Sequence, residues 1–100
     1  MRKKSDITEL KVVASLCLGG PQRVYLSALT REELEYAKHL LNNNYVVLRG
    51  GFIEPSKRLC ELYERYLQCY NDISKKCEWP YGHIHECWMR EWAKCLALLP

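Results

Sequence analysis

The sequence predicts a mainly all-α fold, a small three-helix bundle preceded by a short N-terminal strand or helix. Two segments carry apolar residues at helical spacing behind clear start signals, and a third near the C-terminus repeats the spacing. We predict main helices over residues 30–43, 55–76 and 83–98. A chain of 100 residues makes one domain. We therefore expect a single helical interaction domain over 1–100.

The first predicted helix begins at Thr30. The run Thr30-Arg31-Glu32-Glu33 matches a capping box, in which the threonine hydroxyl accepts from a first-turn amide and Glu33 reaches back to the amide of Thr30. An apolar stripe follows, formed by Leu34, Ala37 and Leu41. Asparagine tolerates left-handed backbone, so the helix should end in the asparagine run at 42–44.

The second predicted helix follows a break at Gly50-Gly51. Pro55 suits a first-turn position, because its missing amide proton is not needed there. One face then carries apolar and aromatic side chains at helical spacing: Leu59, Leu62, Tyr63, Tyr66, Leu67, Tyr70 and Ile73. Neither helix is stable alone in water, so packing between helices must stabilise both.

The N-terminal third is ambiguous. Residues 1–5 form a basic start that we expect to be flexible. The β-branched side chains within residues 6–29 favour a strand. The helical spacing of Leu10, Val13 and Leu16 favours a helix instead. The apolar run at 45–48 likewise suits a strand or a packed connector.

Composition excludes several classes of protein. Apolar residues are 48% of the chain, too many for a disordered tail. The formal net charge of +3 is too mild for a nucleic-acid footprint, so we expect no direct nucleic-acid contact. No run of 18 apolar residues predicts a membrane span. Polar residues interrupt any signal peptide, so we expect the cytosol or nucleus, with the six cysteines mostly reduced.

Aromatic residues gather near the C-terminus, at Trp79, Tyr81, Trp88 and Trp92. Tryptophan and arginine are favoured anchors of protein–protein interfaces, and Arg90 lies between two of these tryptophans. The plainer interpretation is a core face, since Trp88 and Trp92 are one helical turn apart. A domain of this size has little room for three buried tryptophans, so the remainder predicts a partner site.

Two further interpretations concern the cysteines. Cys77, His83, His85 and Cys87 are residue types that bind zinc, but their alternate spacing scatters them around a helix. Half-buried thiols and exposed histidines are therefore the favoured interpretation. The nine residues between Cys77 and Cys87 also match the spacing of disulfide-stapled helical hairpins, with Cys60 and Cys69 as the other candidate pair. That alternative places the protein in an oxidising compartment.

Nothing in the chain selects a catalytic site or a cofactor. There is no phosphate-cradling glycine loop and no nucleophile elbow. His39 stands near the end of the first predicted helix, where interaction with the helix dipole explains it. We expect a protein that is not an enzyme.

The segment Gly51-Phe52-Ile53-Glu54-Pro55, followed by the run from Arg58 to Arg65, resembles the adenoviral early-region-four open-reading-frame-four family. That family has a glycine–aromatic–isoleucine–glutamate–proline turn and then an amphipathic helix led by arginine and leucine. The resemblance covers roughly residues 30–95, and its specific part lies within 50–67.

The resemblance implies a viral early regulator without catalysis of its own. It implies binding to the B-type regulatory subunit of host type 2A protein phosphatase, with effects on transcription, splicing and cell survival. The positions that match the family's arginine–any–tryptophan pattern are Arg90 and Trp92, while its next aromatic falls on Ala93. Leu59 and Leu62 match leucines of the family's helix, whose role is either core or interface, and with Trp88 they complete the expected partner-binding set.

Location follows from the same resemblance. It implies the host nucleus and cytoplasm. The family concentrates in the nucleus through a dense arginine run, whereas residues 74–79 of this chain hold only Lys75 and Lys76 as basic residues. This chain therefore lacks the segment that concentrates the family's members in the nucleus.

Overall fold

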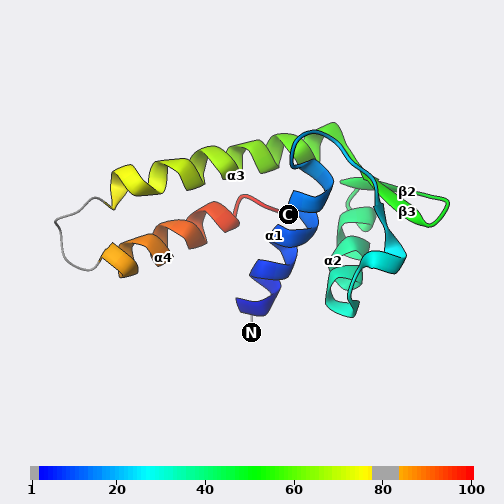
Figure 1. Cartoon of the computed structure of the whole chain (residues 1–100), viewed down its shortest axis with the longest axis horizontal. Coiled ribbons are helices and arrows are strands. Elements are labelled where there is room, and N and C mark those ends of the chain that lie inside the picture. Colours follow the sequence, from blue (N-terminus) through cyan, green and yellow to red (C-terminus); the bar gives the residue numbers. More distant parts are fainter. Residues whose placement is uncertain (1–2, 78–83) are drawn as a thin grey trace.

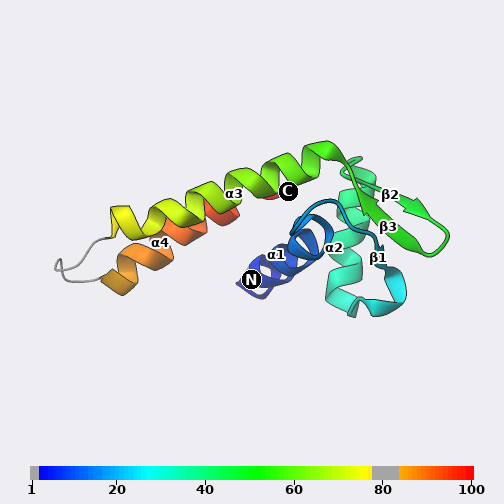
Figure 2. The same cartoon turned by 45° about the horizontal axis from the view of Figure 1, so that its top comes forward.

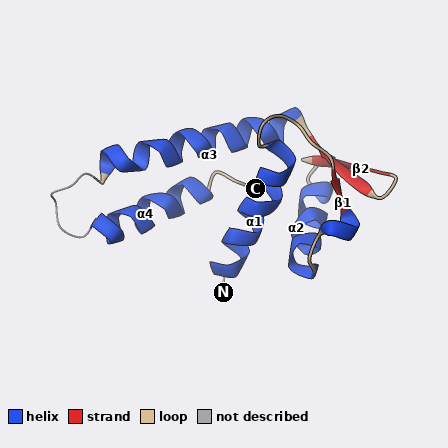
Figure 3. Cartoon of the chain, in the orientation of Figure 1, coloured by secondary structure: helices blue, strands red, loops and turns tan. Residues whose placement is uncertain are grey.

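The computed structural model describes residues 3–77 and 84–100 of the chain. It holds four helices and one small antiparallel sheet, in the order α1 (Lys3–Cys17), β1 (Val24–Tyr25), a 3-10 turn (Leu26–Ala28), α2 (Arg31–Asn42), β2 (Val46–Arg49), β3 (Phe52–Pro55), α3 (Lys57–Lys76) and α4 (Ile84–Leu96). The mainly-α prediction is confirmed. Figure 3 shows the helices as the bulk of the fold, with the strands gathered at one end.

The molecule is elongated, with extents of 52 × 27 × 20 Å. The α3 and α4 helices run antiparallel and project to one side as a hairpin, while α1, α2 and the sheet lie at the other end (Figure 1). The N-terminal part of α3 packs on α1, so this single helix joins the two ends. The predicted bundle of three helices is thus a hairpin attached to a separate helix-and-sheet layer.

The ambiguous N-terminal region forms a helix first and a strand later. The α1 helix buries Val12, Val13 and Leu16, each no more than 1% exposed. It ends at Cys17, and two residues later Gly19 has a φ of 75°, the left-handed conformation that follows many helices and carries no penalty for glycine. The chain then runs extended into β1.

The predicted capping box of α2 is present, whereas the predicted first-turn position of Pro55 is wrong. The Thr30 amide donates to Glu33 Oε1 at 2.8 Å, and the Glu33 amide donates to Thr30 Oγ1 at 3.2 Å, which completes the capping box of α2. At the start of α3 the cap is Ser56, whose Oγ accepts from the Leu59 amide at 3.2 Å. Pro55 ends β3 instead of opening the helix.

The third strand is the element that the sequence analysis missed. Phe52–Pro55 forms β3, the central strand of a sheet with the order β1-β3-β2. Gly50 and Gly51, with φ of 49° and 89°, make the two-residue turn between β2 and β3, a conformation that favours glycine. Figure 2 shows this hairpin with β1 beside it. The run at 45–48 therefore belongs to a strand.

The two faces of the sheet differ. Val46 and Ile53 share one face, are each 2% exposed, and pack against the helices. On the other face the Arg23 guanidinium lies 4.4 Å from the centroid of the Phe52 ring, and Arg49 Nε lies 3.0 Å from Glu54 Oε1. These exposed ion pairs and ring contacts add little stability, so burial on the first face holds the sheet in place.

Candidate functional site: the α3–α4 hairpin

Two disulfides cross-link the hairpin. Cys69 bonds to Cys95, and Cys77 bonds to Cys87. The third disulfide, Cys17–Cys60, ties the end of α1 to the first turns of α3. All six cysteines of the chain are paired, so the expectation of mostly reduced thiols is wrong for this structure.

The pairing follows from helical geometry. Cys69 and Cys77 stand eight positions apart on α3, and Cys87 and Cys95 stand eight positions apart on α4. Because the helices are antiparallel, the outer two cysteines meet and the inner two meet. The sequence analysis placed Cys77 and Cys87 in a hairpin pattern but took Cys60 and Cys69 as the other pair. The equal spacing on both helices was the signal that identifies Cys69 and Cys95 as partners.

Aromatic side chains form a continuous row along one side of the hairpin. Neighbouring ring centroids along this row lie 5.2 to 6.1 Å apart, within the range of favourable aromatic pairs. The row consists of Tyr63, Tyr66, Tyr70 and Trp88. The Trp88 ring meets Tyr70 edge to face at 80°. The row thus passes from α3 to α4.

A hydrogen bond fixes the second indole. Trp92 Nε1 donates to the Tyr66 hydroxyl at 2.8 Å. Tyr66 is 4% exposed, and burial raises the pKa of its phenol, while the hydrogen bond from Trp92 acts in the opposite direction. The indole N–H of Trp92 is therefore satisfied inside the hairpin, and part of the half-buried side chain reaches the surface.

An open pocket of about 490 Å³ lies at the end of the aromatic row. The hairpin lines it with Tyr70, His85, Trp88, Met89 and Trp92. Met89 is 49% exposed and Tyr70 is 39% exposed, so both reach the solvent at its rim. We call this set the aromatic pocket. Its size suits an apolar side chain or a short segment of another molecule.

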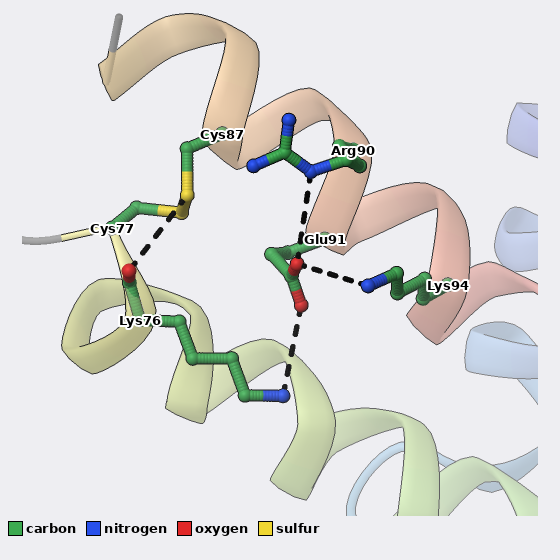
Figure 4. The surroundings of a disulfide bond; sticks show 6 residues. All are labelled: Lys76, Cys77, Cys87, Arg90, Glu91 and Lys94. Carbon is green, nitrogen blue, oxygen red and sulfur yellow. Dashed lines mark hydrogen bonds and ion pairs between the residues drawn. A yellow bond between two sulfur atoms is a disulfide. The ribbon is translucent and has the colours of Figure 1, made fainter. Parts of the chain in front are cut away.

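The other side of the hairpin is charged (Figure 4). Glu91, whose side chain is 13% exposed, accepts from Lys94 Nζ at 3.2 Å and lies 3.6 Å from Lys76 Nζ. Arg90 Nε lies 4.0 Å from the same carboxylate, with 64% of its side chain exposed. The hydrogen bond from Lys94 is the main cause that holds the pKa of Glu91 below its ordinary value. The Cys77–Cys87 disulfide lies beside this cluster.

The structure separates the predicted partner-binding residues. Trp88 and Trp92 line the aromatic pocket, but Arg90 is not among its lining residues and its guanidinium turns to the Glu91 cluster. Leu62 is half-buried on α3. Leu59 is 0% exposed, so it packs in the core and cannot contact a partner in the folded chain. Of the two roles left open for Leu59, its burial supports the core.

The weak zinc interpretation loses two of its four ligands. Cys77 and Cys87 are bonded to each other, and a disulfide sulfur does not provide the thiolate that zinc requires. His85 lines the aromatic pocket, and His83 lies outside the described residues, as do Trp79 and Tyr81. Within residues 3–77 and 84–100 no group of three or more metal-ligating side chains occurs.

Sequence analysis missed Tyr70, Met89 and His85 as pocket residues. A signal existed for α4, because His85, Trp88, Met89 and Trp92 follow the one-face spacing of a helix. No local signal pointed to Tyr70, which comes from the facing helix. Only the antiparallel pairing of α3 with α4 brings it to the same pocket.

Comparison with known proteins does not assign the chain to a family. No family model, no curated protein and no solved structure matches the chain. Among the described helices, none combines the length and apolar character that crossing a bilayer requires. The function must therefore be argued from the hairpin itself.

Proposed function

We propose that this protein acts without catalysis of its own, as a binding module that presents the aromatic pocket of its α3–α4 hairpin to another protein. The observation that supports this is the pocket itself, where two tryptophans, a tyrosine and a methionine converge on one partly exposed surface. Tryptophan and tyrosine supply large contact areas at low entropic cost and dominate binding energy at interfaces.

The proposed partner is the B-type regulatory subunit of host type 2A protein phosphatase. This choice rests on the resemblance at residues 51–65 to the adenoviral early protein family. The motif occupies β3 and the first turns of α3, the helix that leads directly to the pocket. In this proposal the protein is a viral early adaptor of the nucleus and cytoplasm that redirects dephosphorylation, with effects on transcription, splicing and cell survival.

A binding titration with the purified regulatory subunit tests the proposal. Trp88→Ala should weaken binding by about 2 kcal/mol, as expected for an interface anchor. Met89→Asp places a charge on the pocket rim without disturbing the core and should weaken binding at least tenfold. The matched control is Leu48→Asp, because Leu48 is exposed to the same degree, 50% against 49%, but lies on β2.

Arg90→Ala separates the two sides of the hairpin. If the pocket is the interface, this variant should bind within about twofold of the unmodified protein. If Arg90→Ala loses as much binding affinity as Trp88→Ala, the interface lies on the charged side of the hairpin. That result would support Arg90 as the partner contact that the resemblance implies. Absence of measurable binding by the unmodified protein would refute the phosphatase partner.

The second candidate function is that of a disulfide-stapled helical-hairpin protein of an oxidising compartment. It is favoured by the two bonds Cys69–Cys95 and Cys77–Cys87, since such bonds persist mainly in oxidising compartments. Rapid alkylation of thiols in intact cells, followed by mass measurement, distinguishes the two. Six alkylated cysteines place the protein in a reducing compartment, and none places it in an oxidising one.

A further inference from the structure

Two disulfides attach the α4 helix to α3. Cys87 lies in its first turns and Cys95 in its last, so both ends of the helix are bonded to α3. Among the described side chains of Ile84–Leu96, Cys95 is the single one that is fully buried, and it is itself half of a disulfide. Trp88, Trp92 and Leu96 are only half-buried. A helix of 13 residues is marginal in water without such support.

The pocket residues stand between the two attachment points. Trp88, Met89 and Trp92 follow Cys87 and precede Cys95, while the opposite wall, Tyr70, adjoins Cys69 on α3. The pocket exists only while α4 lies against α3, because its walls come from both helices. Non-covalent contacts between the described parts of the two helices include the Trp92–Tyr66 hydrogen bond, the Tyr70–Trp88 ring contact and the exposed Lys76–Glu91 ion pair. Half-buried apolar side chains of α4 also pack against the core.

From this arrangement we propose that the two hairpin disulfides gate the aromatic pocket: it is formed when Cys69–Cys95 and Cys77–Cys87 are oxidised and lost when they are reduced. This inference rests on the proposed function for its biological meaning, since the pocket is the proposed interface. In the nucleus and cytoplasm, where thiols are kept mostly reduced, it restricts partner binding to the fraction of the protein whose hairpin disulfides are oxidised. The state of the pocket is measurable without any partner.

The chemistry requires a cellular monothiol such as glutathione as reductant. In each hairpin disulfide one cysteine is half-buried, Cys69 or Cys87, and the other is buried. A monothiol thiolate attacks the half-buried sulfur, and the buried cysteine sulfur leaves and takes a proton from solvent. A second monothiol thiolate releases the first cysteine, which is protonated in turn. Each disulfide gains two electrons and two protons, and two monothiols become one disulfide.

The experiment compares three full-length proteins by amide hydrogen exchange. The test variant carries Cys69→Ala, Cys77→Ala, Cys87→Ala and Cys95→Ala. The matched control carries Cys17→Ala and Cys60→Ala, which removes the remaining disulfide and leaves the hairpin bonds intact. Alanine is used because it puts no polar group at the buried position of Cys95.

Amides of α4 should exchange at least a hundredfold faster in the test variant than in the unmodified protein, while those of α2 change by less than tenfold. The control should keep α4 protected. Protection of α4 that survives in the test variant overturns the gate. So does loss of protection that spreads equally to α2, because a general loosening is not a gate.

Partner binding is measured on the same samples with the phosphatase regulatory subunit. The gate is supported if the unmodified protein and the control both bind the subunit and the test variant binds it at least tenfold more weakly. Equal binding by all three overturns it. No binding by the unmodified protein refutes the proposed partner alone, and the exchange rates of α4 then decide the gate by themselves.

Discussion

The two ends of the molecule are held together in different ways. We call α1, α2, the sheet and the N-terminal half of α3 the body, and the C-terminal half of α3 with α4 the arm. The body buries a set of aliphatic side chains that are each at most 2% exposed: Val12, Val13, Leu16, Leu40, Val46, Ile53 and Leu59. Among the arm side chains that the structure describes, Ile73 is the aliphatic one buried to that degree, and two disulfides cross-link the helices.

The difference shows how a short chain extends beyond its core. A domain of about 100 residues buries only part of its surface, so one compact core uses most of its large apolar residues. The core cluster continues into the arm through Ile73, Cys77 and Cys95, while Trp88 and Trp92 pack against it at half-burial. Covalent bonds replace the missing buried area, and this leaves the rings free to form a pocket.

The largest expected effect comes from breaking the arm's cross-links. Each disulfide contributes about 2–4 kcal/mol by restricting the unfolded chain, so loss of both should remove about 5 kcal/mol from the arm. The expected result is a separate, earlier thermal transition of the arm. Tryptophan fluorescence reports it, because all three tryptophans of the chain lie between positions 79 and 92. Helical circular dichroism reports the later melting of the body. A single coincident transition would show that the two regions unfold as one.

A cavity in the body should act differently. Leu40 is 0% exposed in α2, and Leu40→Ala should cost about 3 kcal/mol from lost burial and the space left behind. The midpoint of denaturation in urea should fall for the body, while the disulfide-bonded arm keeps its helical amide protection. The control is Leu48→Ala, because Leu48 is 50% exposed and its truncation leaves no internal cavity. An equal shift for both variants would contradict the assignment of the core.

The Trp92–Tyr66 hydrogen bond gives a smaller test within the arm. Trp92→Phe keeps an aromatic ring in place but removes the indole donor, which should cost about 1 kcal/mol. The loss should appear in the arm's transition and not in the body's. Tyr66→Phe removes the acceptor of the same bond, and combining the two changes should cost less than their sum. Full additivity would show that the bond contributes nothing.

Alkaline pH should weaken the protein in both regions. Burial raises the pKa of Tyr36 in the body and of Tyr63 and Tyr66 at the base of the arm. A folded-state pKa above the unfolded value means that the folded protein holds the proton more tightly. The stability is then fully present below pH about 10, the ordinary tyrosine value, and falls as pH rises above it. Urea denaturation at pH 8 and pH 11 measures the loss, and an unchanged midpoint would contradict it.

The smallest expected effect concerns the Tyr36 hydroxyl. It is buried and has no hydrogen-bond partner among the described residues. Removing an unsatisfied buried hydroxyl takes away a desolvation cost, so Tyr36→Phe should be neutral or stabilise the body by up to about 1 kcal/mol. It should also reduce the dependence on alkaline pH. A destabilised variant would mean that the hydroxyl has a partner in solution, such as a buried water.

Much of the helical layout was predictable, because its signals are local. The capping box at Thr30 placed the start of α2 to the residue. The predicted segments 55–76 and 83–98 differ from α3 and α4 by at most two residues at either end. The strand β3 was not predictable in the same way. Its four residues carry no alternation of their own, and they become a strand because β1 and β2 pair with both of its edges.

The candidate site was predictable in its residue types but not in its geometry. Clustered aromatic residues near the C-terminus indicated a surface of interest, and Trp88 with Trp92 line the pocket. Grouping Arg90 with them failed, because residues two positions apart on a helix point to nearly opposite sides. The pairing of the cysteines also depends on which helices are neighbours.

The sequence by itself determined the start of α2 and, to within two residues, the starts of α3 and α4, together with their apolar faces. Caps and periodicity act between residues a few positions apart, so they can be seen in the sequence alone. Only the tertiary structure decided three other features: which cysteines pair, that α3 supplies Tyr70 to a pocket on α4, and that Leu59 is core and not interface. Each of these joins residues that are distant in the chain. Such contacts form only when the whole chain collapses around one core, and no local pattern specifies them.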